Sequence, residues 1–443
     1  MILRFGLTLP ITLLALCAAP VFANDVEPPN IIVILADDLG NGDLGINGSI
    51  IRTPNIDRLA EQGVRLTNFY ASANVCTPSR AGLLTGRYPI RSGLARGVIE
   101  VDSTHGLPQE ELTIAEFLKS RNYRTAIVGK WHLGHADGVG PLDNGFEYFF
   151  GVHYSNDMRP LALYENGEIL ADTANQSTLT KQYTQAATRF IEASGREPFF
   201  LYMAHTFPHI PLHASDEFRG KSAAGIYGDT VEELDWSVGQ LVRVLRKHGL
   251  ERNTLVIFTS DNGAWFEGSN GDRRGMKGLT WDGGFRVPMI AWWPGRIAAG
   301  RVSAGISMNI DIFPTVSELV APGSTDTIEF DGKDVWPLLG GEKTSPHEVL
   351  YLFNDEDIAA VRTQRWKYVT RAFYKTRYIG FEGVRDAMGF DYQLLFDMTQ
   401  PLPERYSLAS NEPDVLQQMQ EYWMDGKRIF DPLRTGPAAE VFP

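Results

Sequence analysis

Two pairs of adjacent side chains, far apart in the chain, offer the carboxylate and amide oxygens best suited to hold a metal ion. Asp37-Asp38 and Asp261-Asn262 each follow an apolar run directly. Three carboxylates and one amide form an all-oxygen ligand set, and Ca²⁺ accepts irregular geometry at six or more oxygens, whereas Mg²⁺ demands an octahedron. Zinc would recruit histidines, but those of this chain show no spacing typical of a zinc site. One pair alone would be read as a turn at a strand end. Together they predict one Ca²⁺ site.

The elements that must position these pairs are strands and helices in alternation. Apolar runs at 31–36, 125–128, 199–203 and 255–258 are typical of strands covered on both faces, and polar residues follow each run. Helical patterns lie at residues 53–63, 113–118 and 229–249. In open α/β sheets the carboxyl edge binds ligands, so we expect the four strand ends to converge on one site. The alternation predicts an α/β fold with a doubly wound core.

The pattern changes beyond about residue 345. Short strand-like pieces at 349–353, 366–369 and 393–396 precede a helical segment at 415–429. We interpret residues 346–443 as a small α+β C-terminal domain that packs on a catalytic domain of residues 24–345.

The N-terminus is typical of a signal peptide of residues 1–23. An apolar run and a small-residue cleavage site follow Arg4, so we expect cleavage after Ala23. Cys17 raises a lipoprotein alternative, which Leu16 disfavours because a small residue is expected there. No later segment has the roughly 18 apolar residues that span a bilayer. We therefore predict a periplasmic or secreted protein in which Cys76 has no partner for an intramolecular disulfide.

The charge balance restricts the partners. The 443 residues carry a net charge of -13, which repels phosphate backbones and anionic lipid surfaces. Nucleic acid and membrane partners are therefore disfavoured. An anionic substrate would have to be attracted by a local basic pocket.

Cys76 opens the most specific motif. CTPSR at residues 76–80 is followed by LTGR at 84–87. This combination resembles the signature of the formylglycine-dependent sulfatases, in which a maturation enzyme oxidises the cysteine to an aldehyde, 3-oxoalanine. The resemblance extends over nearly the whole mature chain and is strongest to arylsulfatase A and the galactosamine-sulfate sulfatases. It implies an alkaline-phosphatase-like core, with a large mixed, mostly parallel sheet flanked by helices, and a C-terminal subdomain with a small antiparallel sheet and a terminal helix.

The resemblance also implies the metal ligands and the nucleophile. The ligands would be Asp37, Asp38, Cys76 (as formylglycine), Asp261 and Asn262. The hydrated aldehyde at position 76 would attack sulfur and expel the alcohol. Deprotonation of its second hydroxyl would then release the sulfate and reform the aldehyde. Residue 76 should lie at a helix N-terminus, where an anion is favoured.

The remaining family motifs supply basic residues. Arg80 would steady the charge beside the diol, and Lys130 and Lys277 would hold sulfate oxygens in the transition state. His132 is the candidate base that breaks the intermediate. His209, with Lys277, is the candidate that protonates the leaving oxygen.

The substrate-binding residues rest on weaker motifs. Ser155 matches a family serine near the sulfate. The candidates for a sugar subsite are His153, Arg159, His213 and Trp265, with an aromatic ring stacking on a sugar and Arg159 meeting a second anionic group. Loop packing is an equally good interpretation of these residues. The expected substrate is a sulfated galactose-type sugar, such as a carrageenan or chondroitin fragment.

Two other functions share this pattern. A formylglycine-dependent phosphonate or phosphate monoester hydrolase has the same fold, but a two-metal phosphatase needs a second ligand cluster where this chain has Lys130, His209 and Lys277. A silent sulfatase-like glycan-binding protein should have lost Cys76 or a metal carboxylate. Sulfate monoester hydrolysis is therefore the favoured hypothesis. The oligomeric state is not predicted.

Overall fold

The computed structural model describes residue 2, residues 27–371 and residues 393–435. Apart from residue 2, the predicted signal peptide of residues 1–23, with Cys17 and the cleavage site after Ala23, lies outside these residues. In the described part of the chain, no helix combines the length and apolar character needed to cross a bilayer.

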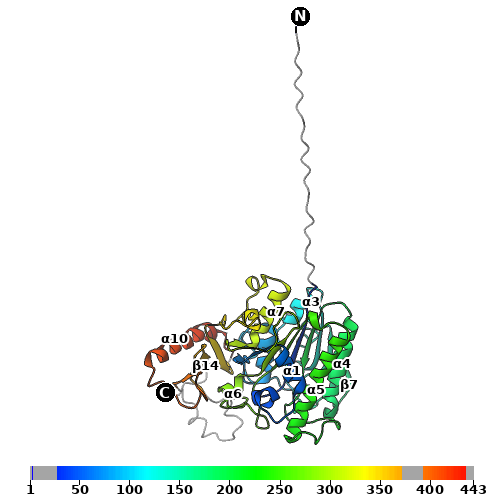
Figure 1. The fold of residues 1–443 in the computed structure, drawn as a ribbon, viewed down its shortest axis with the longest axis horizontal. Coiled ribbons are helices and arrows are strands. Elements are labelled where there is room, and N and C mark those ends of the chain that lie inside the picture. Colours follow the sequence, from blue (N-terminus) through cyan, green and yellow to red (C-terminus); the bar gives the residue numbers. More distant parts are fainter. Residues whose placement is uncertain (1, 3–26, 372–392, 436–443) are drawn as a thin grey trace.

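A ten-stranded sheet forms the centre of the molecule (Figure 1). From one edge to the other, its strands are β11 (Arg301–Ser303), β2 (Val64–Leu66), β10 (Met289–Trp292), β9 (Thr254–Ser260), β1 (Asn30–Ala36), β8 (Phe199–Ala204), β4 (Arg124–Lys130), β5 (Tyr148–Val152), β6 (Leu163–Glu165) and β7 (Glu168–Ala171). Neighbours from β9 to β5 are parallel, whereas β10 is antiparallel to β9 and β6 is antiparallel to β5. The predicted α/β fold with a mixed, mostly parallel sheet is confirmed.

Two layers of helices cover the sheet. Alternate residues of β1 point to opposite faces, so Ile31 and Val33 join one apolar cluster, and Ile32 and Ile34 join the other. The first face is covered by α2 (Cys76–Thr85), α3 (Ile114–Lys119), α7 (Ile312–Val320) and α8 (Trp336–Leu339). The second is covered by α1 (Pro54–Gln62), α4 (Leu179–Ser194) and α5 (Gly225–Lys247), of which α4 and α5 lie on the right in Figure 1. Burial on both faces explains why the central strands are continuous apolar runs.

The four strands predicted from apolar runs are neighbours in this sheet. β9, β1, β8 and β4 run parallel, and Leu35 of β1 lies beside Thr259 and Ala204. Their carboxyl ends therefore meet at one edge, as predicted. Helices α1, α3 and α5 occupy the segments where helical patterns were found.

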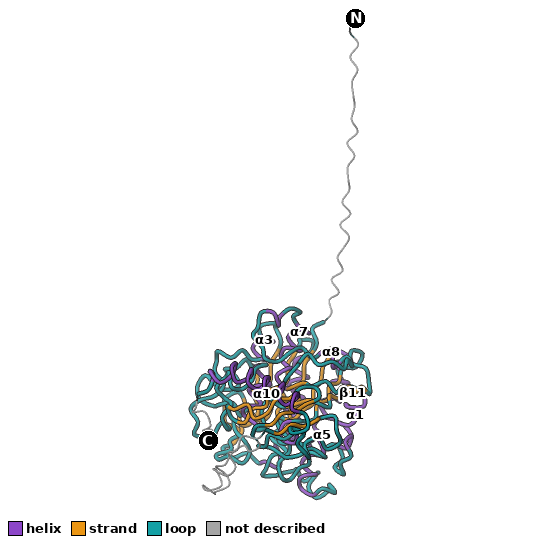
Figure 2. Tube along the Cα trace, turned by 90° about the vertical axis from the view of Figure 1, so that its left-hand side faces the viewer, coloured by secondary structure: helices purple, strands orange, loops and turns teal. Residues whose placement is uncertain are grey.

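A smaller sheet lies beside the terminal helix, which Figure 2 shows on the outer surface. Its antiparallel strands are β13 (Leu350–Asn354), β14 (Asp357–Arg362), β15 (Trp366–Val369) and β16 (Leu394–Asp397). α10 (Pro413–Phe430) packs on β14 and β15, and a short pair, β3 (Phe69–Tyr70) with β12 (Ser307–Met308), joins the same apolar cluster. β14 was not predicted, because alanines weaken its apolar alternation. The domain boundary between 345 and 346 stays a prediction.

A buried ionic network joins the small sheet to the main body. Lys367 on β15 is fully buried, and its Nζ lies 3.1 Å from Asp282 and 2.6 Å from Glu404. Asp282 begins α6 (Asp282–Phe285), which lies low in the centre of Figure 1. Each of these charges is stable at this depth only because the others compensate it.

This network predicts a large effect of one substitution. Lys367→Met should lower the free energy of unfolding by about 3–5 kcal/mol, because Glu404 loses its cation and Asp282 keeps only Arg286. Urea unfolding followed by tryptophan fluorescence measures the change. Arg365 supplies a matched control, since its side chain is 60% exposed and pairs with Asp397 at 2.8 Å. Arg365→Met should change stability by no more than about 1 kcal/mol, and equal losses in the two variants would contradict the assignment.

Candidate active site

Strand ends bring the acidic pairs together. Asp37 and Asp38 directly follow β1, and Asp261 directly follows β9, its parallel neighbour. Ligand atoms of these carboxylates and of Cys76 all lie within 4.8 Å of one another, and all four residues are buried. Asp38 has φ 66°, a conformation that non-glycine residues rarely adopt, so the surrounding contacts must hold it there.

Cys76 is the first residue of α2, a helix in which every residue is buried. Its Sγ lies 3.5 Å from Asp37 Oδ1 and 3.4 Å from Lys277 Nζ. The helix N-terminus adds unpaired N–H groups and the positive end of the helix dipole, both of which favour an anion. Burial raises the pKa of the Cys76 thiol, so an unmodified side chain stays protonated and is a weak nucleophile.

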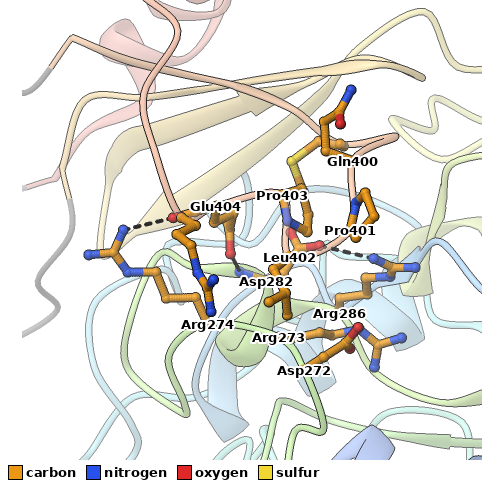
Figure 3. A pocket seen from close by; sticks show the side chains of 12 residues that line it. Asp272, Arg273, Arg274, Asp282, Arg286, Gln400, Pro401, Leu402, Pro403 and Glu404 are labelled. Atoms are coloured by element: carbon orange, nitrogen blue, oxygen red, sulfur yellow. Dashed lines mark hydrogen bonds and ion pairs between the residues drawn. The ribbon is translucent and has the colours of Figure 1, made fainter.

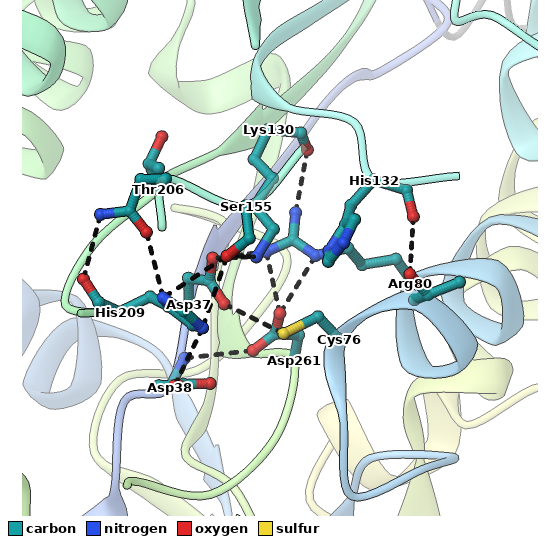
Figure 4. Close-up of polar contacts among 12 residues, drawn as sticks. Asp37, Asp38, Cys76, Arg80, Lys130, His132, Ser155, Thr206, His209 and Asp261 are labelled. Atoms are coloured by element: carbon teal, nitrogen blue, oxygen red, sulfur yellow. Dashed lines mark hydrogen bonds and ion pairs between the residues drawn. The ribbon is translucent and has the colours of Figure 1, made fainter. Parts of the chain in front are cut away.

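Three cations compensate the three carboxylates, and Figure 4 shows two of them, Arg80 and Lys130. The ion pairs are Arg80 with Asp261 at 2.8 Å, Lys130 with Asp37 at 2.6 Å, and Lys277 with Asp38 at 2.8 Å. The formal charges of the cluster therefore cancel without a bound ion. A divalent cation would make the cluster net positive, which suits an anionic substrate.

The compensation is uneven among the carboxylates. Burial opposes the charge of Asp37, but Lys130 and Arg80 hold the pKa of this carboxyl well below its usual range. Burial and the adjacent Asp37 raise the pKa of Asp261 to about 7, despite its contact with Arg80. Burial also opposes the charge of Lys277, whose pKa is nevertheless raised well above its usual value by Asp38.

Asn262 carries the observation that tests the predicted cation. Its Nδ2 donates to Asp38 Oδ1 at 2.7 Å, whereas its Oδ1 is buried and has no hydrogen-bond partner among the described residues. A buried amide oxygen is destabilising unless a positive group approaches it. This oxygen and the three carboxylates form the hard-oxygen set that Ca²⁺ prefers, so the residues fit a calcium ion.

Two close backbone approaches allow this arrangement. Gly129 has φ 118°, and a Cβ at this position would lie 1.8 Å from a backbone oxygen of β8, so only glycine fits before Lys130. A Cβ at Gly263 would lie 1.7 Å from the backbone oxygen of Gly283. This contact lets the loop that carries Lys277 pack against the end of β9.

His209 reaches the cluster through its imidazole. Its Nε2 lies 3.7 Å from Asp38, and Ser155 Oγ lies 3.4 Å from each ring nitrogen. Nδ1 lies 3.0 Å from Asn156 Oδ1, an oxygen that can only accept, so Nδ1 carries the proton. Burial and the nearby Lys277 lower the pKa of His209, which favours this neutral form.

Asn156 was not predicted to have this contact. Its Nδ2 donates to Gln176 Oε1 at 3.0 Å and to the carbonyl oxygens of His209 and Pro211. These three acceptors orient the amide so that Oδ1 faces the ring of His209. No sequence motif links residue 176 to residue 156, so this support is visible only in the fold.

His132 is held in one tautomer by a different contact. Its Nε2 lies 3.1 Å from the carbonyl oxygen of Ile99, so Nε2 carries the proton, and its Nδ1 is buried with no partner in the described part of the chain. Burial and Lys130 lower the pKa of His132 well below its usual value. Thr77, another unpredicted residue, donates to the backbone oxygen of His132 and accepts from the backbone N–H of Ile99. His132 is thus a neutral ring with a free acceptor.

The predicted sugar-binding residues separate into two groups. Ser155 lies within the cluster, 3.2 Å from Lys130 Nζ. The others lie in loops that follow β5, β8 and β9, where their contacts are local: His153 packs on Tyr164, Arg159 donates to backbone oxygens of its own loop, His213 packs on Phe207, and Trp265 packs on Phe266. Their role in binding sugar stays a prediction.

The sequence and the fold are similar to those of known proteins. A family model described as Sulfatase matches residues 29–322. Steryl-sulfatase of Homo sapiens is 36% identical over 507 residues, covering 89% of this chain and 87% of the relative. N-acetylgalactosamine-6-sulfatase of Canis lupus familiaris is 40% identical over 376 residues, covering 77% and 71%. The solved structure of Ps i-CgsB in complex with k-i-k-neocarrahexaose has a TM-score of 0.79 and 29% identity, covering 90% of this chain and 93% of that one.

The chain therefore belongs to the sulfatase family. It is a sulfuric ester hydrolase, and the resemblance inferred from the Cys76 motif is confirmed.

The contact between Asn156 and His209 generates a prediction. Asn156→Ala should lower kcat for a small aryl sulfate by about 10- to 100-fold with little change in KM, because His209 loses the side-chain acceptor that orients its ring and keeps only the carbonyl oxygen of Ile210 as a partner of Nδ1. Asn156→Asp keeps an acceptor oxygen and should recover part of the rate. Gln176→Ala, which removes a neighbour of Asn156 but leaves the acceptor, is the packing control. If the loss of kcat in all three variants is proportional to the loss of melting temperature, Asn156 has a structural role only.

Proposed function

We propose that this chain is an exported, formylglycine- and calcium-dependent sulfatase that hydrolyses sulfate monoesters of a sulfated sugar. The observation that carries the proposal is the position of Cys76, at the N-terminus of α2 between Asp37 and Lys277. The proposal requires one partner, a maturation enzyme that oxidises Cys76 to formylglycine.

The two groups that the chain itself lacks have separate tasks. Formylglycine at position 76 supplies, once hydrated, an oxygen nucleophile in place of a protonated thiol. Ca²⁺ held by Asp37, Asp38, Asp261 and Asn262 supplies a Lewis acid.

The residues of the chain bind the sulfate and hold the charges in place. Arg80 is fully buried and donates two hydrogen bonds to Asp261, so it keeps that carboxylate oriented. Lys130 and Lys277 present ammonium groups on two sides of the cluster and would bind sulfate oxygens as negative charge develops. Both are preorganised by carboxylates, so little reorganisation is needed during the reaction.

Proton transfer would involve two histidines, His132 and His209, together with Lys277. The Nδ1 of His132, which has no partner among the described residues, would act as an acceptor for a proton from the group at position 76. His209 and Lys277 both lie against Asp38, and this pair would serve the leaving alcohol oxygen. The Lys277 ammonium would give the proton directly, whereas His209 would give one only after its Nε2 is protonated, because the proton of the neutral ring is on Nδ1.

The class of sugar is proposed from the names of similar proteins and from the proposed export of the chain. One relative is named for N-acetylgalactosamine 6-sulfate chemistry, and one structural neighbour was solved with a neocarrahexaose. A galactose-type glycan, such as a carrageenan or chondroitin fragment, is therefore the proposed substrate. Ser155 would lie nearest the sulfate, and His153, Arg159, His213 and Trp265 would line the path of the sugar.

The nucleophile is tested by mass spectrometry of the peptide that contains Cys76. In active protein this peptide should have lost sulfur and two hydrogens and gained one oxygen. Cys76→Ser should abolish aryl sulfate turnover while circular dichroism stays unchanged, because a single hydroxyl cannot release sulfate by forming an aldehyde. A matched phosphate ester serves as the comparison substrate. Fully active protein with an unmodified cysteine, or faster hydrolysis of the phosphate ester, would refute the proposal.

The metal is tested by elemental analysis and by chelation. The protein should contain one Ca²⁺ per chain, and its removal should lower activity and reduce the melting temperature by a few degrees, since an ion bound only by the folded state stabilises it. Asp261→Asn should abolish this calcium dependence. Asp43→Asn is the control, because Asp43 is a buried carboxylate that bonds Tyr227 outside the cluster. Full activity without calcium in the protein would overturn the assignment.

A further inference from the structure

A second pocket lies between α6 and the loop that follows β16 (Figure 3). Its volume is about 470 Å³. Four arginines and three carboxylates line it: Arg273, Arg274, Arg286, Arg405, Asp272, Asp282 and Glu404. None of these residues belongs to the catalytic cluster.

Two of the three carboxylates of this pocket, Asp282 and Glu404, are already paired with cations. Asp282 and Glu404 both contact the buried Lys367, and Asp282 also pairs with Arg286 at 3.2 Å. With Lys367 included, cations outnumber carboxylates by two around the pocket. This local positive charge occurs in a protein whose overall charge is -13, so it cannot be attributed to general composition.

Several guanidinium groups have donors left over. Arg273 Nε is buried and has no partner among the described residues, and burial together with Arg286 lowers the pKa of Arg273 to about 10. Within the same described residues, Arg405 makes no hydrogen bond or ion pair. Arg274 lies over the ring of Trp281 at 3.7 Å and donates one hydrogen bond, to the backbone oxygen of Glu404. Unpaired guanidinium donors of this kind are suited to oxyanions, which they can bind bidentately.

The pocket is close to the catalytic cluster along the chain. Lys277 follows Arg274 by three residues, so their Cα atoms are at most about 11 Å apart. The segment between them is fixed, because Gly283 N donates to the backbone oxygen of Arg274 and Gly278 N donates to that of Asn74, two residues before Cys76. The pocket and the catalytic cluster are therefore joined by one short, fixed segment, a separation that an oligosaccharide can span.

We propose that this pocket binds a second anionic group, a sulfate or a carboxylate, on a sugar next to the one that loses its sulfate. This inference rests on the proposed function, since it gives the sulfated glycan a second charged group. Selection would come from local charge and guanidinium geometry, because the field of the whole protein repels such a substrate.

The experiment compares three substrates in one double variant. The double variant carries Arg274→Gln and Arg405→Gln. Both arginines are exposed in the structure, so their replacement should leave the fold intact. For a galactose disaccharide with a sulfate on each sugar, kcat/KM should fall by about 10- to 100-fold, mainly through KM, because charged hydrogen bonds are lost. The rates for the disaccharide with one sulfate and for a small aryl sulfate should change less than twofold. Replacement of both arginines by lysine should restore part of the preference.

Arg296→Gln is the matched control. Arg296 is also an exposed arginine over a tryptophan ring, with its guanidinium 5.4 Å from the ring centre of Trp293. The Trp293 indole donates to the backbone oxygen of Arg252, which lies just before the amino end of β9 and so at the opposite end of that strand from the active site. This substitution should alter none of the three rates.

The outcomes separate the pocket from the sulfatase chemistry. If the wild-type protein, with Cys76 shown by mass spectrometry to be formylglycine, fails to hydrolyse the aryl sulfate, the proposed function is wrong. If it hydrolyses the aryl sulfate but the double variant keeps the preference for two sulfates, or loses all three substrates equally, the pocket proposal is wrong. Added inorganic sulfate tests a free anion as the ligand: inhibition of aryl sulfate turnover that the double variant relieves would show that the pocket serves a free anion and would overturn the proposal.

Discussion

The structure depends on holding three carboxyl groups close together at the carboxyl edge of a buried sheet. Removing such charges from water destabilises the fold unless each one is compensated at close range. The register of β1 with β9 brings the carboxylates within reach of one another, and the compensation comes from elsewhere: Arg80 from α2, Lys130 from the end of β4, and Lys277 from a loop. The tight glycine contacts beside β8 and at Gly263 exist because these three sources must approach closely.

The parts that were predictable are those with a local signal. The four central strands follow from continuous apolar runs, since both faces of the sheet are covered, and the acidic pairs follow from their place at the ends of those runs. The CTPSR segment fixes the place of Cys76 because the motif and the helix start coincide. In each case the information lies within a few consecutive residues.

The parts that were missed depend on contacts between distant segments. Asn156 acts through a hydrogen bond to a ring 53 residues away, and its own orientation depends on Gln176. Thr77 contributes through backbone atoms of Ile99 and His132, which no side-chain pattern reveals. His153 has the residue type of a sugar ligand, yet it packs among aromatic rings. β14 escaped notice because alanines pack well in a small sheet without forming an apolar pattern.

The burial of Cys76 bears on the order of events in the life of the chain. Its side chain is only 2% exposed, and all of α2 is enclosed by the sheet and its covering helices. Another protein could not bind the segment around Cys76 and oxidise this cysteine unless the surrounding domain unfolded. The conversion proposed for Cys76 therefore belongs to the interval before the polypeptide folds, so that a molecule which folds first is committed to remain without its nucleophile.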